Sequence, residues 1–133
     1  MQWADVDGDG ALDLALAGSR ADATHTLLHN TLPPAVAHRS LRVRVLDAQG
    51  HATRAGAEVR IYASGTNRLL ATRLVDTGSG YDSQSDVPVH FGLASMAAVD
   101  VEVTVLTKGK RVSTRTRRVS PAKYVGKVMT VKF

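Results

Sequence analysis

The sequence predicts an all-β protein whose main domain is an antiparallel β-sandwich. Three observations favour this class. Val and Thr, whose branched side chains suit strands, occur 17 and 12 times among the 133 residues. Many of them stand in short runs that alternate apolar with polar residues, and Gly, Asn and Asp separate the runs. Short strands joined by short turns are typical of antiparallel sandwiches or small barrels, not of βαβ units.

The N-terminal residues 1–31 predict an acidic loop followed by a hairpin. Leucine alternates with other residues over 12–17, which predicts one strand, and 26–30 predicts the second. Gly18 and Ser19 supply the turn between them. A two-stranded hairpin is marginally stable by itself, so we expect it to pack against the main domain, a partner or upstream sequence.

Residues 32–37 are expected to form a linker between this N-terminal unit and a main domain spanning 38–133. The segment begins Leu-Pro-Pro-Ala, and neither proline can donate a backbone hydrogen bond. Such a sequence favours extended, polyproline-like geometry.

Within the main domain, the clearest strand is 99–106. Its four valines alternate with Asp100, Glu102 and Thr104, so that one face is apolar. Further strands are expected at 41–46, 57–63, 69–76, 87–91, 110–119 and 128–133. Turns are expected at 47–50, 64–67, 78–80 and 108–109. Residues 94–98 could form one helical turn at most.

Composition excludes several classes of site. The chain has no Cys, which rules out disulfides, thiolate zinc sites and a cysteine nucleophile. No apolar run approaches the roughly 20 residues that span a bilayer, so we expect no membrane insertion. The net charge of +5 is uneven, because nine of the 17 basic residues and none of the 12 acidic ones lie within 108–133.

Four aspartates within the first 13 residues form the most informative pattern in the sequence. Asp5, Asp7 and Asp9 occupy alternate positions, and Asp13 follows four residues after the third. Gly10, between Asp9 and Asp13, suits a turn conformation that other residues resist. Calcium binds six to eight oxygens at about 2.3–2.6 Å, and such spacing lets several oxygens converge. The sequence therefore predicts a Ca²⁺ site, with water completing the shell. Its expected ligands are Asp5, Asp7, Asp9, the backbone carbonyl of Ala11, and Asp13.

Other interpretations of this loop fit less well. An EF-hand requires Glu at the twelfth position, where this chain has Leu16, and a strand follows instead of a helix. Magnesium seldom accepts an all-protein cage. A solvated acidic turn stays open, although two unit charges about 4 Å apart repel by roughly 4 kcal/mol at an effective dielectric of 20.

The remaining polar clusters favour structural roles, and we expect no enzymatic activity. Gly78–Tyr81 lacks the G-x-S-x-G pattern of a nucleophile elbow. His90 is interpreted as a hydrogen-bonded structural histidine in preference to a triad member with Ser79 and Asp82, and the other histidines lack zinc-site spacing. Asp82 and Asp86 could bind a second cation with loop carbonyls, which is the less favoured interpretation.

The basic C-terminal stretch leaves two interpretations open. Arg111, Arg115 and Arg117 would share one face of a strand, which could bind phosphates or sulfated glycans. A solvated, charge-protected strand is the favoured interpretation. Interleaved aromatic residues are missing, so nucleic acid is not an expected partner.

Two parts of the chain resemble known families. Residues 3–18, with their spaced aspartates and leucine strand, resemble the calcium loop of FG-GAP or VCBS-type repeats, which form β-propeller blades. The segments RAGAEVR (54–60), GSGYDSQS (78–85) and HFGL (90–93) resemble successive motifs of the ASPIC/UnbV domain. That domain typically follows FG-GAP repeats in secreted proteins similar to cartilage acidic protein. Residues 106–110 depart from the Trp-Pro turn that the family often has.

The resemblance implies a partial propeller blade in residues 1–31, because a whole blade takes about 40–45 residues. It further implies that the chain is the C-terminal end of a longer protein, with upstream propeller repeats as its neighbours. The expected function is a non-enzymatic, calcium-binding module of a secreted, periplasmic or cell-surface protein, used in adhesion or in recognition of an unknown protein or glycan. The alternatives are a polyanion-binding module and an accessory domain of an upstream hydrolase.

Overall fold

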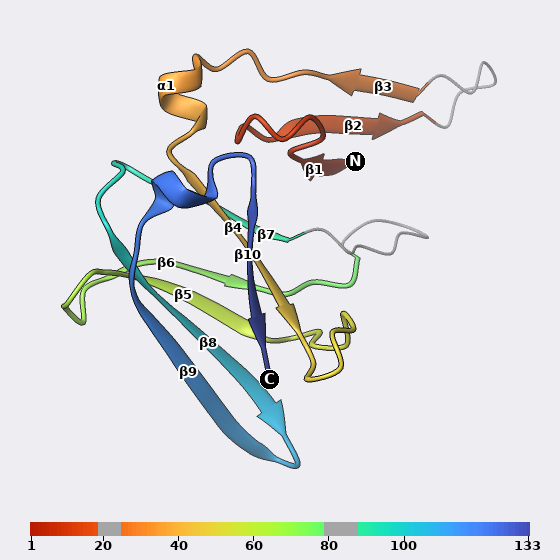
Figure 1. The fold of residues 1–133 in the computed structure, drawn as a ribbon. Helices are drawn as coiled ribbons and strands as arrows, with labels where there is room; N and C mark the ends of the chain where they lie inside the picture. The colour runs from red at the N-terminus through yellow and green to blue at the C-terminus, as the bar shows by residue number, and fades with distance from the viewer. Residues whose placement is uncertain (19–24, 79–87) are drawn as a thin grey trace.

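The computed structural model describes residues 1–18, 25–78 and 88–133. Within these residues the chain forms three sheets, and none of the three closes into a barrel (Figure 1). The prediction of an all-β protein is therefore confirmed. Some predicted features lie wholly or partly outside the described residues: the turns at 18–19 and 78–80, the motif at 78–85, Asp82, Asp86 and the strand start at Val87.

The N-terminal sheet has three antiparallel strands in the order β1-β2-β3. They are β1 (Gln2–Ala4), β2 (Asp13–Ala17) and β3 (His25–Leu28). The hairpin of β2 and β3 follows the leucine alternation, with Leu14 opposite Leu28. Strand β1 was not predicted, because a strand of three residues is too short to show an alternating pattern.

A short helix, α1 (Pro34–Ala37), occupies the segment that was expected to be extended. The prediction of polyproline-like geometry is right for Pro33, with φ −56° and ψ 141°, and wrong for the next four residues. Pro34 stands at the first helical position, where its fixed φ suits the helix and its missing N–H costs nothing. Ala37 is buried at the end of the turn.

The second sheet has the order β10-β4-β7. It contains β4 (Ser40–Leu46), β7 (Val89–Gly92) and β10 (Val128–Lys132). β7 is antiparallel to β4, but β10 is parallel to it, so the wholly antiparallel prediction is wrong at this edge. After Val119 the chain turns through the 3₁₀ helix η1 (Pro121–Tyr124) and enters this sheet running in the direction of β4.

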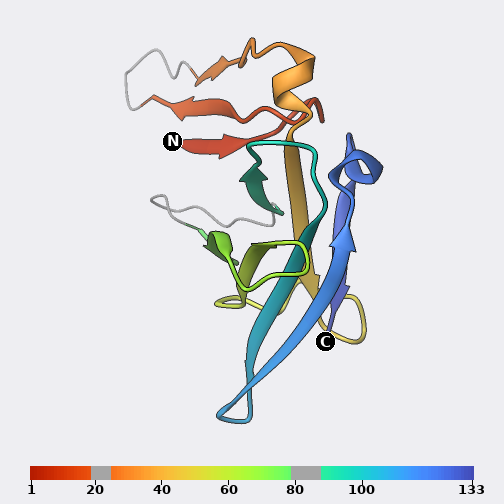
Figure 2. The same cartoon turned by 90° about the vertical axis from the view of Figure 1, so that its left-hand side faces the viewer.

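The third sheet has four antiparallel strands in the order β6-β5-β8-β9. They are β5 (Glu58–Ala63), β6 (Leu69–Leu74), β8 (Val99–Thr107) and β9 (Lys110–Val119). The hairpin of β8 and β9 extends beyond the rest of the sandwich (Figure 2). Residues 94–98 contain no helix.

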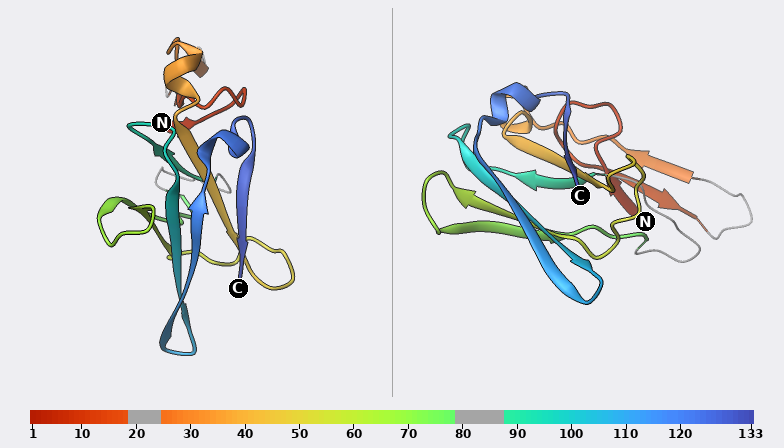
Figure 3. Two further views of the ribbon diagram at one scale, coloured as in Figure 1. Left: turned by 60° about the vertical axis from the view of Figure 1, so that its left-hand side comes forward. Right: turned by 60° about the horizontal axis from the view of Figure 1, so that its bottom comes forward.

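The second and third sheets pack face to face around one apolar core, and the N-terminal sheet lies at one end of this sandwich (Figure 3). The predicted apolar face of residues 99–106 points into the core, because its four valines are each at most 3% exposed. The largest apolar side chains that are fully buried in the core are Phe91, Leu41, Ile61, Val43, Val59, Val101 and Val103. None of the helices among the described residues is long and apolar enough to cross a bilayer.

Asp100 is buried on the opposite face of β8, where it connects the β5–β6 turn to strand β9. It accepts hydrogen bonds from Ser64 Oγ at 2.9 Å, from the Arg118 N–H at 3.0 Å and from the Gly65 N–H at 3.3 Å. Arg115 Nη2 lies 3.2 Å from the same carboxylate. The Arg118 N–H is the main reason why the pKa of Asp100 lies below its ordinary value, with Ser64, Gly65 and Arg115 adding to it. One carboxylate thus joins the β5–β6 turn to β9.

We predict that Asp100→Asn lowers the melting temperature at pH 7, because the amide cannot replace the charge that Arg115 and the two N–H groups face. A carboxyl whose folded pKa is depressed stabilises the protein above its unfolded pKa, near 3.8. That stabilisation is lost as the pH falls through the folded value. The difference between wild type and variant should therefore shrink below about pH 4. Equal differences at pH 7 and pH 3 in thermal melts would contradict this role.

Candidate metal centre

The acidic loop, residues 5–13, connects β1 to β2 and curls back on itself. Its curl depends on two glycines, Gly8 with φ +82° and Gly10 with φ +96°, in a region that side chains disfavour. All four aspartates accept backbone N–H groups from within the loop, as turn-forming aspartates commonly do. The loop is therefore folded around its own carboxylates.

Asp5 anchors the start of the loop. Its side chain is 2% exposed and lies 2.9 Å from Nη1 of Arg42 on β4. It also accepts the Gly8 N–H at 2.8 Å and the Gly10 N–H at 3.2 Å. A carboxylate has about four lone-pair sites, so these three contacts leave Asp5 acceptor capacity for an ion.

Asp13 anchors the end of the loop at the first residue of β2. It is 1% exposed and accepts the Asn30 N–H at 2.8 Å, the Val6 N–H at 3.1 Å and His29 Nδ1 at 3.1 Å. The Asn30 N–H is the main reason why the pKa of Asp13 lies below its ordinary value. Asp13 therefore stays ionised in the fold and ties the loop to the segment after β3.

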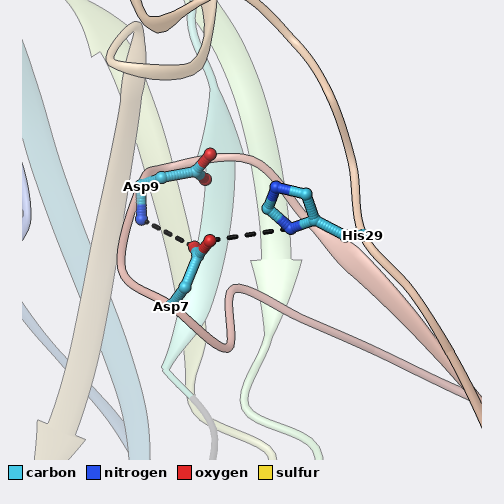
Figure 4. Close-up of side chains that lie close together, drawn as sticks. All are labelled: Asp7, Asp9 and His29. Carbon is cyan, nitrogen blue, oxygen red and sulfur yellow. Dashed lines mark hydrogen bonds and ion pairs between the residues drawn. The ribbon is translucent and has the colours of Figure 1, made fainter.

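Asp7 and Asp9 lie between the two anchors and meet His29. One ligand atom from each of the three residues lies within 4.8 Å of the others, an arrangement that could hold a metal ion (Figure 4). Asp7 Oδ1 accepts the Asp9 N–H at 3.1 Å, and Asp7 Oδ2 lies 3.6 Å from His29 Nδ1. Asp9 Oδ1 accepts the N–H of Ala11 at 2.7 Å. These side chains are more exposed than the anchors, so an ion could reach them from solvent.

The five predicted ligand residues thus fall into two groups. Asp7 and Asp9 come together at the candidate centre, while Asp5 and Asp13 are buried at its two ends, and Ala11 is buried next to Asp9. Sequence reasoning missed His29, which it placed among scattered histidines. The hairpin register could have indicated it. Leu14 pairs with Leu28 in antiparallel strands, so that Asp13, which precedes Leu14, lies beside His29, which follows Leu28.

The loop is also attached to the sandwich through Gly10. His90 Nε2 donates to the Gly10 carbonyl at 2.9 Å, so His90 is hydrogen-bonded as predicted. Ser79 and Asp82, its partners in the alternative triad, lie outside the described residues. Gly10 itself packs against the carbonyl of Ala37 at the end of α1. A Cβ at Gly10 would collide with that carbonyl and would lie 2.7 Å from Ser40 Oγ. No other residue fits here without moving the loop away from the sandwich.

A cavity of about 590 Å³ lies between β1 and the sandwich. Its lining includes the half-exposed indole of Trp3 and the side chains of Arg42, Arg73 and His90. The guanidinium carbon of Arg73 lies 5.9 Å from the centre of the Phe91 ring. The cavity therefore combines an aromatic surface with cationic groups, beside the acidic loop.

The basic C-terminal stretch is partly compensated by acidic neighbours. Arg111 Nη2 lies 2.9 Å from Glu58, and Arg115 pairs with Asp100 while its guanidinium stacks 4.3 Å from the centre of the Tyr62 ring. Two of the three arginines singled out in the sequence therefore have carboxylate partners on the same sheet. The third, Arg117, is exposed.

The comparisons with known proteins concern the sandwich. A protein-family model described as ASPIC and UnbV matches residues 47–122, which is more than half of the chain. The match spans the three motifs named in the sequence analysis and ends before the C-terminal strand. No curated protein and no solved structure matches the chain. The acidic loop lies outside the matched range.

We predict that Gly10→Ala destabilises the protein more than Gly8→Ala. Both positions have positive φ, which costs a residue with a side chain about 1–3 kcal/mol. Only Gly10 would also collide with Ala37, because nothing lies within 4 Å of a Cβ at Gly8. Chemical denaturation of both variants measures the difference. Equal losses of unfolding free energy would mean that the loop does not pack against α1 as described.

Proposed function

The chain belongs to the ASPIC/UnbV family, and we propose that it is a non-enzymatic, calcium-binding recognition module of a secreted, periplasmic or cell-surface protein. The observation that carries this proposal is the arrangement of the acidic loop. Two buried carboxylates, Asp5 and Asp13, hold its ends on N–H donors, and Asp7 and Asp9 converge between them. The N–H donors on Asp5 and Asp13 would help to hold the loop in this conformation, which would lower the entropic cost of binding an ion.

Calcium is the ion that this donor set favours. Carboxylate and carbonyl oxygens suit hard cations, and a loop of variable geometry suits Ca²⁺ better than the strictly octahedral Mg²⁺. His29 adds an imidazole beside Asp7 and Asp13, and imidazole is a ligand for zinc and other transition metals. We propose that His29 supports Asp13 by its hydrogen bond and that the ion is held by the aspartates and the Ala11 carbonyl.

We further propose that the N-terminal sheet is part of an FG-GAP or VCBS-type propeller blade, in a protein similar to cartilage acidic protein. The supporting observation is that an aspartate-rich loop joins two adjacent antiparallel strands, β1 and β2. Such a module would work outside the cytoplasm, where calcium sites with dissociation constants of about 10⁻⁴–10⁻³ M are common.

The cavity beside the loop supports the recognition part of the proposal. Trp3 offers an indole face, and Arg73 offers a guanidinium group, which can bind carboxylates and stack on flat groups, whereas Arg42 is already paired with Asp5. A protein or glycan ligand bearing acidic groups fits this lining. The polyanion-binding alternative through β9 is less favoured, because Arg111 and Arg115 already have carboxylate partners.

We predict that calcium raises the thermal stability of the chain and that the aspartates of the loop are required. With a dissociation constant of about 10⁻⁴ M, 1 mM calcium would stabilise the fold by about 1.4 kcal/mol. For a domain of this size that corresponds to a rise in melting temperature of about 5 °C. The measurement is a pair of melts, one with calcium and one with a chelator. The double variant Asp7→Asn, Asp9→Asn should lose the rise.

Two controls sharpen this experiment. Asp47→Asn changes a carboxylate in the turn after β4, where Asp47 accepts the N–H of His51, and it should keep the calcium response. In His29→Ala, calcium should still raise the melting temperature. If the centre were a zinc site, this change would instead abolish the rise in melting temperature that zinc produces. If the wild type has the same melting temperature with calcium as with the chelator, the proposed calcium binding is contradicted.

A further inference from the structure

Two residues of the sandwich hold the acidic loop, and they are direct neighbours. Arg42 on β4 reaches Asp5 at 2.9 Å, and His90 on β7 reaches the Gly10 carbonyl at 2.9 Å. Arg42 and His90 stand opposite each other in the β4–β7 pair. Side chains of residues that pair directly across two strands lie on the same face of a sheet. One cross-strand pair therefore contacts both the start and the middle of the loop.

The contact at Asp5 is the stronger of the two. Its carboxylate is 2% exposed and the Arg42 side chain 16% exposed, so the ion pair is largely removed from water. Removing one partner of such a pair leaves an uncompensated charge in the protein. Asp5 cannot change its position without giving up Arg42 as well as the Gly8 and Gly10 N–H groups. The position of the loop and the position of β4 are therefore linked.

The second contact connects the candidate ion ligands to β7. Gly10 follows Asp9 directly in the sequence, and its carbonyl accepts from His90 while its Cα packs on Ala37. An ion held by Asp7 and Asp9 would restrict the peptide that carries this carbonyl. Ordering of the loop would then favour the His90 hydrogen bond, and the formed hydrogen bond would favour the ordered loop.

We propose that Arg42 and His90 couple ion binding in the acidic loop to the β4–β7 edge of the sandwich, through the Asp5 carboxylate and the Gly10 carbonyl that they hold. This inference rests on the proposed calcium binding. Both residues are positioning residues, because they act on the ion through Asp5 and Gly10. Linkage makes the effect reciprocal: if attachment to the sandwich favours the ion, the ion favours attachment by the same factor. A higher calcium concentration would thus strengthen the attachment of the N-terminal sheet to the sandwich.

Hydrogen exchange of the whole chain, with calcium and with a chelator, tests this coupling. In the wild type we expect calcium to slow amide exchange in residues 5–13 and also, by about fivefold, at residues 40–43 and 89–92. In Arg42→Gln the loop should still be slowed by calcium, but residues 40–43 should respond no longer. His90→Ala provides a second variant, in which residues 89–92 should lose their response.

Arg117→Gln is the matched control, since it removes the same charge from an exposed position on β9 and should behave as wild type. The coupling is contradicted if residues 40–43 and 89–92 of the two variants respond to calcium as strongly as those of the wild type. It is also contradicted if calcium slows only the loop of the wild type, a result that leaves the proposed function intact. If calcium slows neither region of the wild type, the proposed function itself fails.

Discussion

The structure depends on how it accommodates four carboxylates within nine residues. Like charges this close repel one another, and positive and polar groups from three parts of the chain offset this repulsion. Asp5 is contacted by backbone N–H groups of the loop and by Arg42 on β4. Asp13 is contacted by the segment after β3, through the Asn30 N–H. The remaining pair, the carboxylates of Asp7 and Asp9, lies on the more open side of the loop. These two side chains are the physical basis for expecting a cation.

Buried carboxylates play the same part elsewhere in the molecule. Asp100 joins a turn to a distant strand by accepting their N–H groups, as Asp13 joins the loop to the segment after β3. In each case an ionised side chain with several donors replaces apolar packing where the chain is irregular. A small sandwich with an attached sheet can in this way fix its connections without disulfides, which a chain lacking Cys cannot form.

Local patterns predicted most of the strands, whereas partners in space were not predictable. Alternation located the hairpin of residues 12–30 and the buried valines of β8, because a strand with one face in the core must alternate. The parallel position of β10, the helical turn at α1 and the contacts of Arg42 and His29 depend on segments far apart in sequence. The spaced aspartates indicated a cation site from sequence alone, but not which of them would be buried as anchors.

The most direct test of the central claim is a calorimetric titration of the metal-free chain with calcium chloride. We expect saturable binding of one ion per chain with a dissociation constant of about 10⁻⁴ M, which places the site among the extracellular calcium modules. Absence of saturable heat up to about 10 mM calcium, a hundred times that constant, would contradict it.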